Sequence, residues 1–418
     1  MNIELIAIGD ELLNGLIADK NARWLAEFLF KKGILLKKIT MLRDEEEILK
    51  ETFKKSFENN DFTIVTGGLG PTQDDVTKAI LGEVFGGPQE ENQKAIELVG
   101  QQYLKLNREW NRESNCYHMI PSGIEPVRNP IGLAPGLHFQ QNGKHILCAP
   151  GVPREFYGMF EEEIYPLIQS HTNFPKKSLK QVMVRTKGVP EEEIFYTKCP
   201  NLWKDLSQYG QVASLPQLLG IDILVKFYVK DENEFIEKEK AIREIINESK
   251  IAENVWSWDE SPLEDLIIKE ANEKGLTISL AESCTGGMSS DRLTNVSGAS
   301  KSFLASFVTY SNDIKIKTLN VKKETLENFG AVSLECAKEM AAGARNFSGS
   351  DVAISYTGIA GPTGGSVEKP VGTVAIGWAT KNENSSKIYN FKGSRELLKT
   401  RFSEAGLLIL HELLRDIS

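Results

Sequence analysis

The alternation of short apolar runs with segments of helical spacing constrains the fold of this chain most. Between residues 1 and 170, apolar runs at 3–8, 34–40, 62–66 and 145–149 alternate with predicted helices at 21–32, 45–59 and from 72 onward. The alternation returns near the end of the chain, with predicted helices at 263–274, 333–347 and 394–415 and predicted strands at 276–280, 303–309, 351–356, 371–379 and 387–392. Strands that alternate with helices form crossover units on mainly parallel sheets. The sequence therefore predicts an α/β fold in both regions.

The intervening segment has a different pattern. A strand at 180–186, a strand pair near Val212 and at 221–229, and a charged helix at 233–249 suit a small α+β module. The composition becomes loop-like at 170–175 and changes again at 256–262. We therefore predict three domains, covering residues 1–172, 173–257 and 258–418.

The composition indicates in which environment the protein works and which classes of partner it does not bind. The 418 residues carry a formal net charge of −9, which argues against a broad nucleic-acid or anionic-membrane surface. Five scattered cysteines form no Cys-x-x-Cys pair, as expected in a reducing compartment. No apolar run approaches the roughly 20 residues that a membrane span needs, and the first residues show no basic leader. We expect a cytoplasmic protein with no membrane or nucleic-acid partner.

One serine motif suggests chemistry in the last domain. The stretch AESCTGG at 281–287 lies between an apolar run and a segment of helical spacing, which predicts a strand, a turn and a helix. Glycines let a backbone approach a ligand, and N–H groups at a helix start bind phosphate or a developing oxyanion. No histidine lies between His171 and His411, so a nucleophilic Ser283 would need Lys315 or Tyr310 as its base. Alternatively, Ser283 only caps a helix.

Several motifs together resemble one family. The stretches at 281–287, 310–315, 330–333, 357–362 and 368–373 resemble the C-terminal domain of the CinA (competence/damage-inducible) family, which contains nicotinamide mononucleotide deamidases. The resemblance implies that Ser283 is the nucleophile and that Tyr310 and Lys315 assist proton transfer. It implies that the substrate is bound by Thr285, Gly286, Gly287, Thr357 and Gly361. No cofactor is expected for this reaction.

The phosphate of such a substrate needs a cation. Arg395 is a plausible partner because a guanidinium group binds phosphate through two parallel hydrogen bonds. Lys399 or Arg401 could fill the same role.

A glycine-rich segment suggests a second site near the start of the chain. The segment TGGLGPTQDDVT at 66–77 follows a strand and opens a helix, so Gly67, Gly68, Gly70 and Thr72 could wrap a phosphate. The carboxylates of Asp74 and Asp75, with Asp10 as a further candidate, could bind a divalent cation that bridges a pyrophosphate. Acidic residues at a helix start are also ordinary capping residues.

This region resembles the N-terminal domain of the same family. The stretches at 9–15, 66–77, 129–136 and 150–155 resemble its molybdopterin-binding, MoaB/MogA-like fold, which implies a three-layer α/β domain. The resemblance also implies metal-dependent hydrolysis of ADP-ribose at its pyrophosphate. The chain departs from the usual pattern at Leu133, Tyr117-His118 and Arg154.

The middle segment resembles the KH-type linker module of the family. It lacks a Gly-x-x-Gly loop, so nucleic-acid binding is not expected there, and a spacer or oligomerisation role is favoured. We expect the protein to form a homo-oligomer, specifically a dimer. The function expected from the whole sequence is hydrolysis of nicotinamide mononucleotide to nicotinic acid mononucleotide and ammonia, with ADP-ribose hydrolysis as a second activity in pyridine nucleotide recycling. The alternative is a non-catalytic binding factor associated with competence or recombination.

Overall fold

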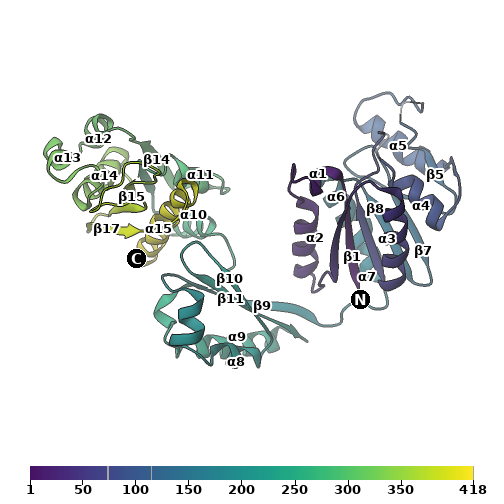
Figure 1. Ribbon diagram of the computed structural model, residues 1–418, viewed down its shortest axis with the longest axis horizontal. Helices are drawn as coiled ribbons and strands as arrows, with labels where there is room; N and C mark the ends of the chain where they lie inside the picture. The colour runs from purple at the N-terminus through teal and green to yellow at the C-terminus, as the bar shows by residue number, and fades with distance from the viewer. Residues whose placement is uncertain (73–74, 114, 418) are drawn as a thin grey trace. The chain divides into compact units, whose positions relative to one another are not determined.

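The computed structural model describes residues 1–72, 75–113 and 115–417 of the chain. They form two compact units, one of residues 1–181 with 226–240 and one of residues 182–225 with 241–418 (Figure 1). Within the described residues, no helix is both long enough and apolar enough to cross a lipid bilayer. The three-domain division stays a prediction.

The first domain is built on a six-stranded sheet with the order β2-β1-β3-β8-β7-β6. Strands β1, β2, β3 and β8 are parallel, as the alternation predicts. At one edge of the sheet, β7 pairs antiparallel with β8, and β6 pairs antiparallel with β7. The strands are β1 (Ile3–Ile8), β2 (Lys38–Leu42), β3 (Phe62–Thr66), β6 (Glu125–Val127), β7 (Gly136–Gln141) and β8 (Lys144–Ala149).

Helices cover both faces of this sheet. Because successive side chains of a strand point to opposite faces, Ile3 and Ile6 of β1 enter two different cores. Helices α2 (Lys20–Lys31) and α6 (Pro153–Met159) pack on one face, and α3 (Glu46–Asn59) and α4 (Thr77–Phe85) pack on the other. The result is the three-layer domain that the sequence predicts. The remaining elements are α1 (Asp10–Leu13), α5 (Gln93–Lys105), α7 (Tyr165–Ser170), a π-helix (Phe160–Ile164) and the paired β4 (Gln89–Glu91) and β5 (Met119–Pro121).

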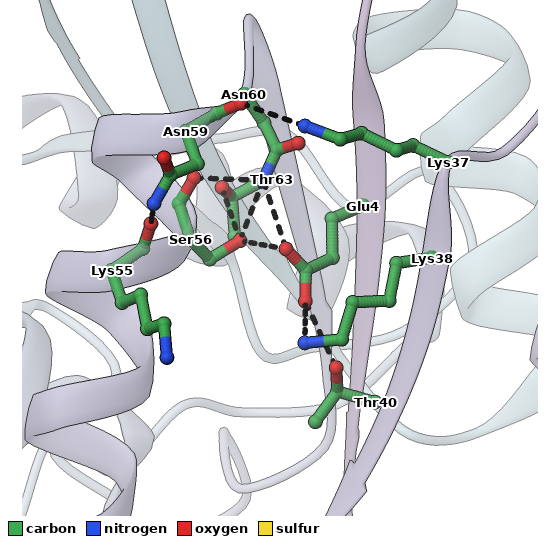
Figure 2. A network of polar contacts seen from close by, with 9 residues as sticks. All are labelled: Glu4, Lys37, Lys38, Thr40, Lys55, Ser56, Asn59, Asn60 and Thr63. Carbon is green, nitrogen blue, oxygen red and sulfur yellow. Dashed lines mark hydrogen bonds and ion pairs between the residues drawn. The ribbon is translucent and has the colours of Figure 1, made fainter.

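A buried carboxylate links this sheet to α3. Glu4 of β1 accepts hydrogen bonds from Ser56 at 2.9 Å, from Asn60 at 2.8 Å and from Thr40 at 2.9 Å, and it pairs with Lys38 at 3.1 Å (Figure 2). Burial raises the pKa of Glu4, but the hydrogen bonds outweigh it and leave the pKa below its ordinary value. The network therefore replaces apolar packing between β1, β2 and α3.

The middle of the chain forms a four-stranded sheet with the order β10-β11-β9-β12. It comprises β9 (Ser178–Thr186), β10 (Gln211–Pro216), β11 (Ile221–Val229) and β12 (Val255–Ser257), with α8 (Leu202–Ser207), α9 (Glu232–Asn247) and two short helices, Glu193–Lys198 and Ala252–Asn254. The predicted strands and the charged helix are thus present, and the KH-type assignment stays a prediction.

The last domain contains a five-stranded sheet with the order β14-β13-β15-β16-β17. Strands β14 (Phe303–Val308), β13 (Ile278–Glu282) and β15 (Val352–Gly358) are parallel, and β16 (Thr373–Ala379) and β17 (Asn384–Asn390) complete it antiparallel.

Helices again lie on both faces of this sheet. Leu280 of β13 belongs to a core with α10 (Leu263–Lys274) and α15 (Arg395–Asp416), whereas Ala281 packs with α14 (Leu334–Ser348). Three short helices complete the domain: α11 (Met288–Thr294), α12 (Asn312–Leu319) and α13 (Lys323–Phe329), together with a single 3-10 turn at Ala299–Lys301.

Candidate active site

Ser283 lies at the carboxyl end of β13, between β14 and β15 in the sheet. Its N–H donates to the Tyr356 carbonyl at 3.0 Å, which fixes the residue against β15. The chain then turns through Gly286 and Gly287, which have φ values of 62° and 95°, before α11 begins at Met288. A side chain at either position would be strained in this left-handed conformation. The predicted strand, turn and helix are therefore present, and the Ser283 side chain is 9% exposed rather than open to solvent.

Lys315 of α12 supplies the basic group beside this serine. Its Nζ lies 3.1 Å from Ser283 Oγ and donates to the Thr309 carbonyl at 2.8 Å. The side chain is 1% exposed, and burial lowers the pKa of Lys315. Among the described residues, no carboxylate lies within ion-pair distance of this amine. A neutral Lys315 can thus keep its bond to Thr309 and accept the Ser283 proton through its lone pair.

Two main-chain N–H groups of the turn remain available to an oxyanion. The Gly286 N–H donates within the turn at 3.2 Å, and the Gly287 N–H donates to the Glu282 carboxylate at 2.9 Å. Within the part of the chain that the structure describes, the N–H groups of Cys284 and Thr285 have no oxygen acceptor and face the Cys284 sulfur. Sulfur is a weak acceptor, so an oxyanion can compete for these two of the four N–H groups at 284–287.

The side chains of Cys284 and Thr285 are buried. Burial raises the pKa of Cys284 to about 12, so its thiol stays protonated. The Thr285 hydroxyl has no hydrogen-bond partner among the described residues.

Tyr310 is brought to Arg395 instead of to the serine. Its side chain is 65% exposed, and its hydroxyl accepts a hydrogen bond from Arg395 Nη2 at 3.3 Å. Arg395 Nη1 donates to the Gly361 carbonyl at 2.5 Å. Arg395 thereby connects the segment after β14 with the loop after β15.

The other two basic candidates of α15 differ in direction. A Cβ atom built on Gly286 would lie 3.7 Å from Lys399 Nζ, so this amine reaches the Ser283 turn. Arg401 donates to the Lys392 carbonyl instead. Arg395 and Lys399 are one helical turn apart on the same side of α15, and neither has a carboxylate partner among the described residues.

Thr357 and Gly361 shape the wall of this region. The Thr357 hydroxyl donates to the Ala331 carbonyl at 2.7 Å, so it ties the end of β15 to the segment before α14. Gly361 has a φ of 73°, and a Cβ atom there would lie 2.6 Å from Val371 Cγ1. The backbone at this position requires glycine.

The first domain holds a separate cavity of about 890 Å³ at the carboxyl ends of its strands. The glycine-rich segment forms part of its wall. Gly67 has a φ of 107°, and a Cβ atom there would lie 2.3 Å from the Ile8 carbonyl oxygen, whereas one on Gly68 would lie 2.2 Å from Thr77 Oγ1. The loop can therefore present its peptide groups to the cavity only with glycine at these two positions.

Of the acidic candidates, Asp75 lines the cavity, but its carboxylate is bonded within the loop. Asp75 accepts hydrogen bonds from the N–H groups of Gly70 and Thr72, each at 2.8 Å. Asp74 lies outside the described residues. Asp10 is exposed and lies 3.8 Å from Arg43, and the cavity wall includes its neighbour Glu11 instead.

Two polar residues of the cavity wall were missed by the sequence-based site prediction. Asp19 caps α2 through one oxygen, and its other oxygen is buried without a hydrogen-bond partner in the described chain. The Asn21 amide nitrogen bonds to Thr66 and Gly151 at 2.9 Å each, which leaves its oxygen unpartnered in the same way. Across residues 1–72, 75–113 and 115–417, no group of three or more His, Cys, Asp or Glu is arranged to hold a metal ion.

These observations define an α/β protein with two separate sites, a serine–lysine pair in one domain and a glycine-walled cavity in another. Residues 260–414 match the CinA C-terminal domain, and residues 4–170 match the probable molybdopterin binding domain. The chain is 37% identical to a CinA-like protein from Chloroherpeton thalassium, over 99% of both chains. It is also 37% identical to a putative competence-damage inducible protein from Caldanaerobacter subterraneus, over 96% of this chain and 95% of the relative. The chain belongs to the CinA family.

Solved structures match parts of the chain. The competence/damage inducible protein CihA from Agrobacterium tumefaciens is 37% identical, and the match covers 38% of this chain and 99% of CihA, with a TM-score of 0.35.

Proposed function

We propose that the C-terminal domain hydrolyses the carboxamide of nicotinamide mononucleotide to give nicotinic acid mononucleotide and ammonia. The observation that carries the proposal is the buried amine of Lys315 at 3.1 Å from Ser283 Oγ. Membership of the CinA family supports it, because that family contains such deamidases. The names of the two relatives, a CinA-like protein and a putative competence-damage inducible protein, state no reaction.

The first step is transfer of the acyl group to the enzyme. Ser283 Oγ attacks the carboxamide carbon while Lys315 takes the hydroxyl proton. The N–H groups of Cys284 and Thr285 stabilise the negative oxygen of the tetrahedral intermediate. Lys315 then gives its proton to the amide nitrogen, and the carbon–nitrogen bond breaks. Ammonia departs, and the acyl group remains as an ester on Ser283.

Water completes the reaction. Lys315 takes a proton from the water that attacks the ester, and the second tetrahedral intermediate expels Ser283 Oγ, to which Lys315 returns the proton. Nucleophile, base and oxyanion donors all come from this chain, so we propose that the deamidase works without a cofactor.

Arg395 and Lys399 bind the phosphate of the nucleotide in this proposal. Both cations lack a carboxylate partner within the described residues, and Lys399 reaches the Ser283 turn. A bound phosphate would draw Arg395 away from Tyr310. The Tyr310 hydroxyl would then be free to assist proton transfer.

The test is ammonia release from nicotinamide mononucleotide by the purified full-length protein, without added metal, beside the variant Ser283→Ala. The control Ser348→Ala removes a hydroxyl that bonds to two carbonyls of α14 and to the N–H of Ser350, just beyond the helix. We expect release by the wild type and by Ser348→Ala and none by Ser283→Ala. Release by Ser283→Ala would exclude the serine as nucleophile. No release by the wild type would overturn the proposal and favour the non-catalytic binding factor.

We also propose that the N-terminal cavity binds a nucleotide with a pyrophosphate group and hydrolyses ADP-ribose to AMP and ribose 5-phosphate. The buried, unpartnered oxygens of Asp19 and Asn21 beside the glycine loop favour this second function. The test measures AMP formation from ADP-ribose with and without Mg²⁺ or Mn²⁺, for wild type and Asp19→Asn. The proposal is supported if the wild type forms AMP and Asp19→Asn does not. It is overturned if the wild type forms no AMP under any of these conditions.

A further inference from the structure

Glu282, the last residue of β13, has a fully buried carboxylate that collects donors from the start of α11. One oxygen accepts the N–H groups of Gly287 at 2.9 Å and Ser289 at 3.3 Å. The other accepts the N–H of Ser290 at 2.9 Å and also the Ser290 hydroxyl. In the described part of the chain, no cationic side chain lies within ion-pair distance of this carboxylate.

The Ser290 hydroxyl links this carboxylate to the neighbouring strand. It donates to Glu282 and also points as a donor to Ser306 Oγ of β14, at 2.6 Å. Since a hydroxyl has one proton, Glu282 and Ser306 share Ser290 as their donor. Ser290 therefore joins the end of β13 and the start of α11 to β14.

The main chain of the same residue reaches the other half of the candidate site. The Glu282 carbonyl accepts the N–H of Thr309 at 2.8 Å, and the Thr309 carbonyl accepts Lys315 Nζ at 2.8 Å. The side chain of Glu282 thus anchors the turn that carries Ser283, while its carbonyl anchors the peptide that holds Lys315.

We propose that Glu282 is a positioning residue for the serine–lysine pair. By binding the Gly287 N–H, its carboxylate sets the turn so that the N–H groups of Cys284 and Thr285 stay available to the oxyanion. A glutamine could accept at only one of the two oxygen positions and would turn an NH₂ group toward N–H donors at the other. The charge of Glu282 therefore fixes the geometry of the turn and does not bind the substrate. This inference rests on the proposed deamidase function.

The decisive variant is Glu282→Gln in the full-length protein, assayed for ammonia release from nicotinamide mononucleotide. Displacement of the turn should lower kcat on the order of 10- to 100-fold. KM should change little because Arg395 and Lys399 lie on α15 and do not bond to Glu282. A role in stability alone would lower the folded fraction but not kcat per folded molecule, so kcat is normalised to the folded fraction obtained from urea unfolding.

The matched control is Asp351→Asn. Asp351 accepts the N–H and the hydroxyl of Thr277, at 2.8 and 2.7 Å, at the opposite end of β13. This control should keep the wild-type kcat even where its melting temperature falls as far as that of Glu282→Gln. A wild-type kcat for Glu282→Gln, or an equal loss of kcat in the control, overturns the proposal.

A second variant guards against loss of folding. Ser290→Ala removes the hydroxyl donor and leaves the three N–H donors on Glu282. It should lower kcat about tenfold, as expected for the loss of one hydrogen bond to a charged group. If Glu282→Gln does not fold, a wild-type kcat for Ser290→Ala overturns the proposal.

Labelling by a fluorophosphonate probe separates this inference from the identity of the substrate. The probe reacts with activated serines, so it reports on Ser283 without any nucleotide. Slower labelling of Glu282→Gln than of wild type supports the positioning role even if nicotinamide mononucleotide is not hydrolysed. Equal labelling rates overturn the positioning role even if the deamidase function stands.

Discussion

Lys315 and Ser283 meet at 3.1 Å although a turn, a helix and a strand separate them in the sequence. Both side chains are buried, and the amine is held from behind by the Thr309 carbonyl. The pairing is a property of the parallel sheet, because the ends of β13 and β14 lie side by side. Four predictions follow from this site and from the first domain.

The deamidase should gain activity with rising pH. The proposed base is the neutral amine of Lys315, whose pKa burial lowers. Below that pKa the amine is protonated and cannot take the Ser283 proton, so kcat/KM should rise to a plateau with its midpoint below the ordinary pKa of lysine. A pH–rate profile measures this. The variant Lys315→Arg stays charged and should be inactive throughout, and a flat wild-type profile would exclude Lys315 as the base.

Removal of either phosphate-binding cation should weaken binding of the nucleotide. Lys399→Met and Arg395→Met should each raise KM for nicotinamide mononucleotide about tenfold, the value of one hydrogen bond between charged groups. Nicotinamide riboside lacks the phosphate, so its kcat/KM should hardly change. Arg401→Met is the control, since Arg401 bonds to the Lys392 carbonyl. Equal losses with both substrates would contradict the assignment.

Gly67→Ala should damage the first domain selectively. The new Cβ would lie 2.3 Å from the Ile8 carbonyl oxygen, in a left-handed conformation. Strain of this kind costs about 1–3 kcal/mol and would move the loop from the cavity wall. We expect loss of ADP-ribose hydrolysis with unchanged deamidase activity, both measured on one preparation. The control Gly143→Ala has a similar φ but open space around it, so it should retain both activities.

Glu4→Gln should destabilise the first domain in a pH-dependent way. The variant loses the ion pair with Lys38 and part of the network, a cost of about 1–3 kcal/mol near neutral pH. The folded-state pKa of Glu4 is lowered, so its contribution is present above the unfolded-state pKa and is lost as pH falls through the folded-state pKa. Urea unfolding at several pH values should show the difference between wild type and Glu4→Gln shrink on acidification. A constant difference would contradict this account.

The sequence predicts elements well where apolar spacing is strong. The predicted helix at 394–415 corresponds to α15 (Arg395–Asp416), and the predicted strand at 62–66 is β3. The run at 34–40 was predicted as a strand, but β2 covers Lys38–Leu42, because Ile34 enters the core from the loop after α2. The short antiparallel β6 carries little apolar signal and was missed.

Site residues could be predicted as types but not as partners. The motif at 281–287 indicates a serine at a turn, and the structure adds that Gly287 is committed to Glu282. The sequence does not reveal that the Tyr310 hydroxyl accepts a hydrogen bond from Arg395. These two residues lie far apart in the chain, so no local pattern encodes their pairing.

Helix α15 has a consequence for how the last domain becomes competent. Its apolar side chains, Leu398 and Phe402 among them, are buried in the main core of that domain. The same helix carries Arg395 and Lys399 toward the other half of the site. Because one rigid helix both completes the core and supplies these two cations, a partly folded domain would contain Ser283 but lack the phosphate-binding residues. The affinity of the domain for a nucleotide would therefore report whether its folding is complete.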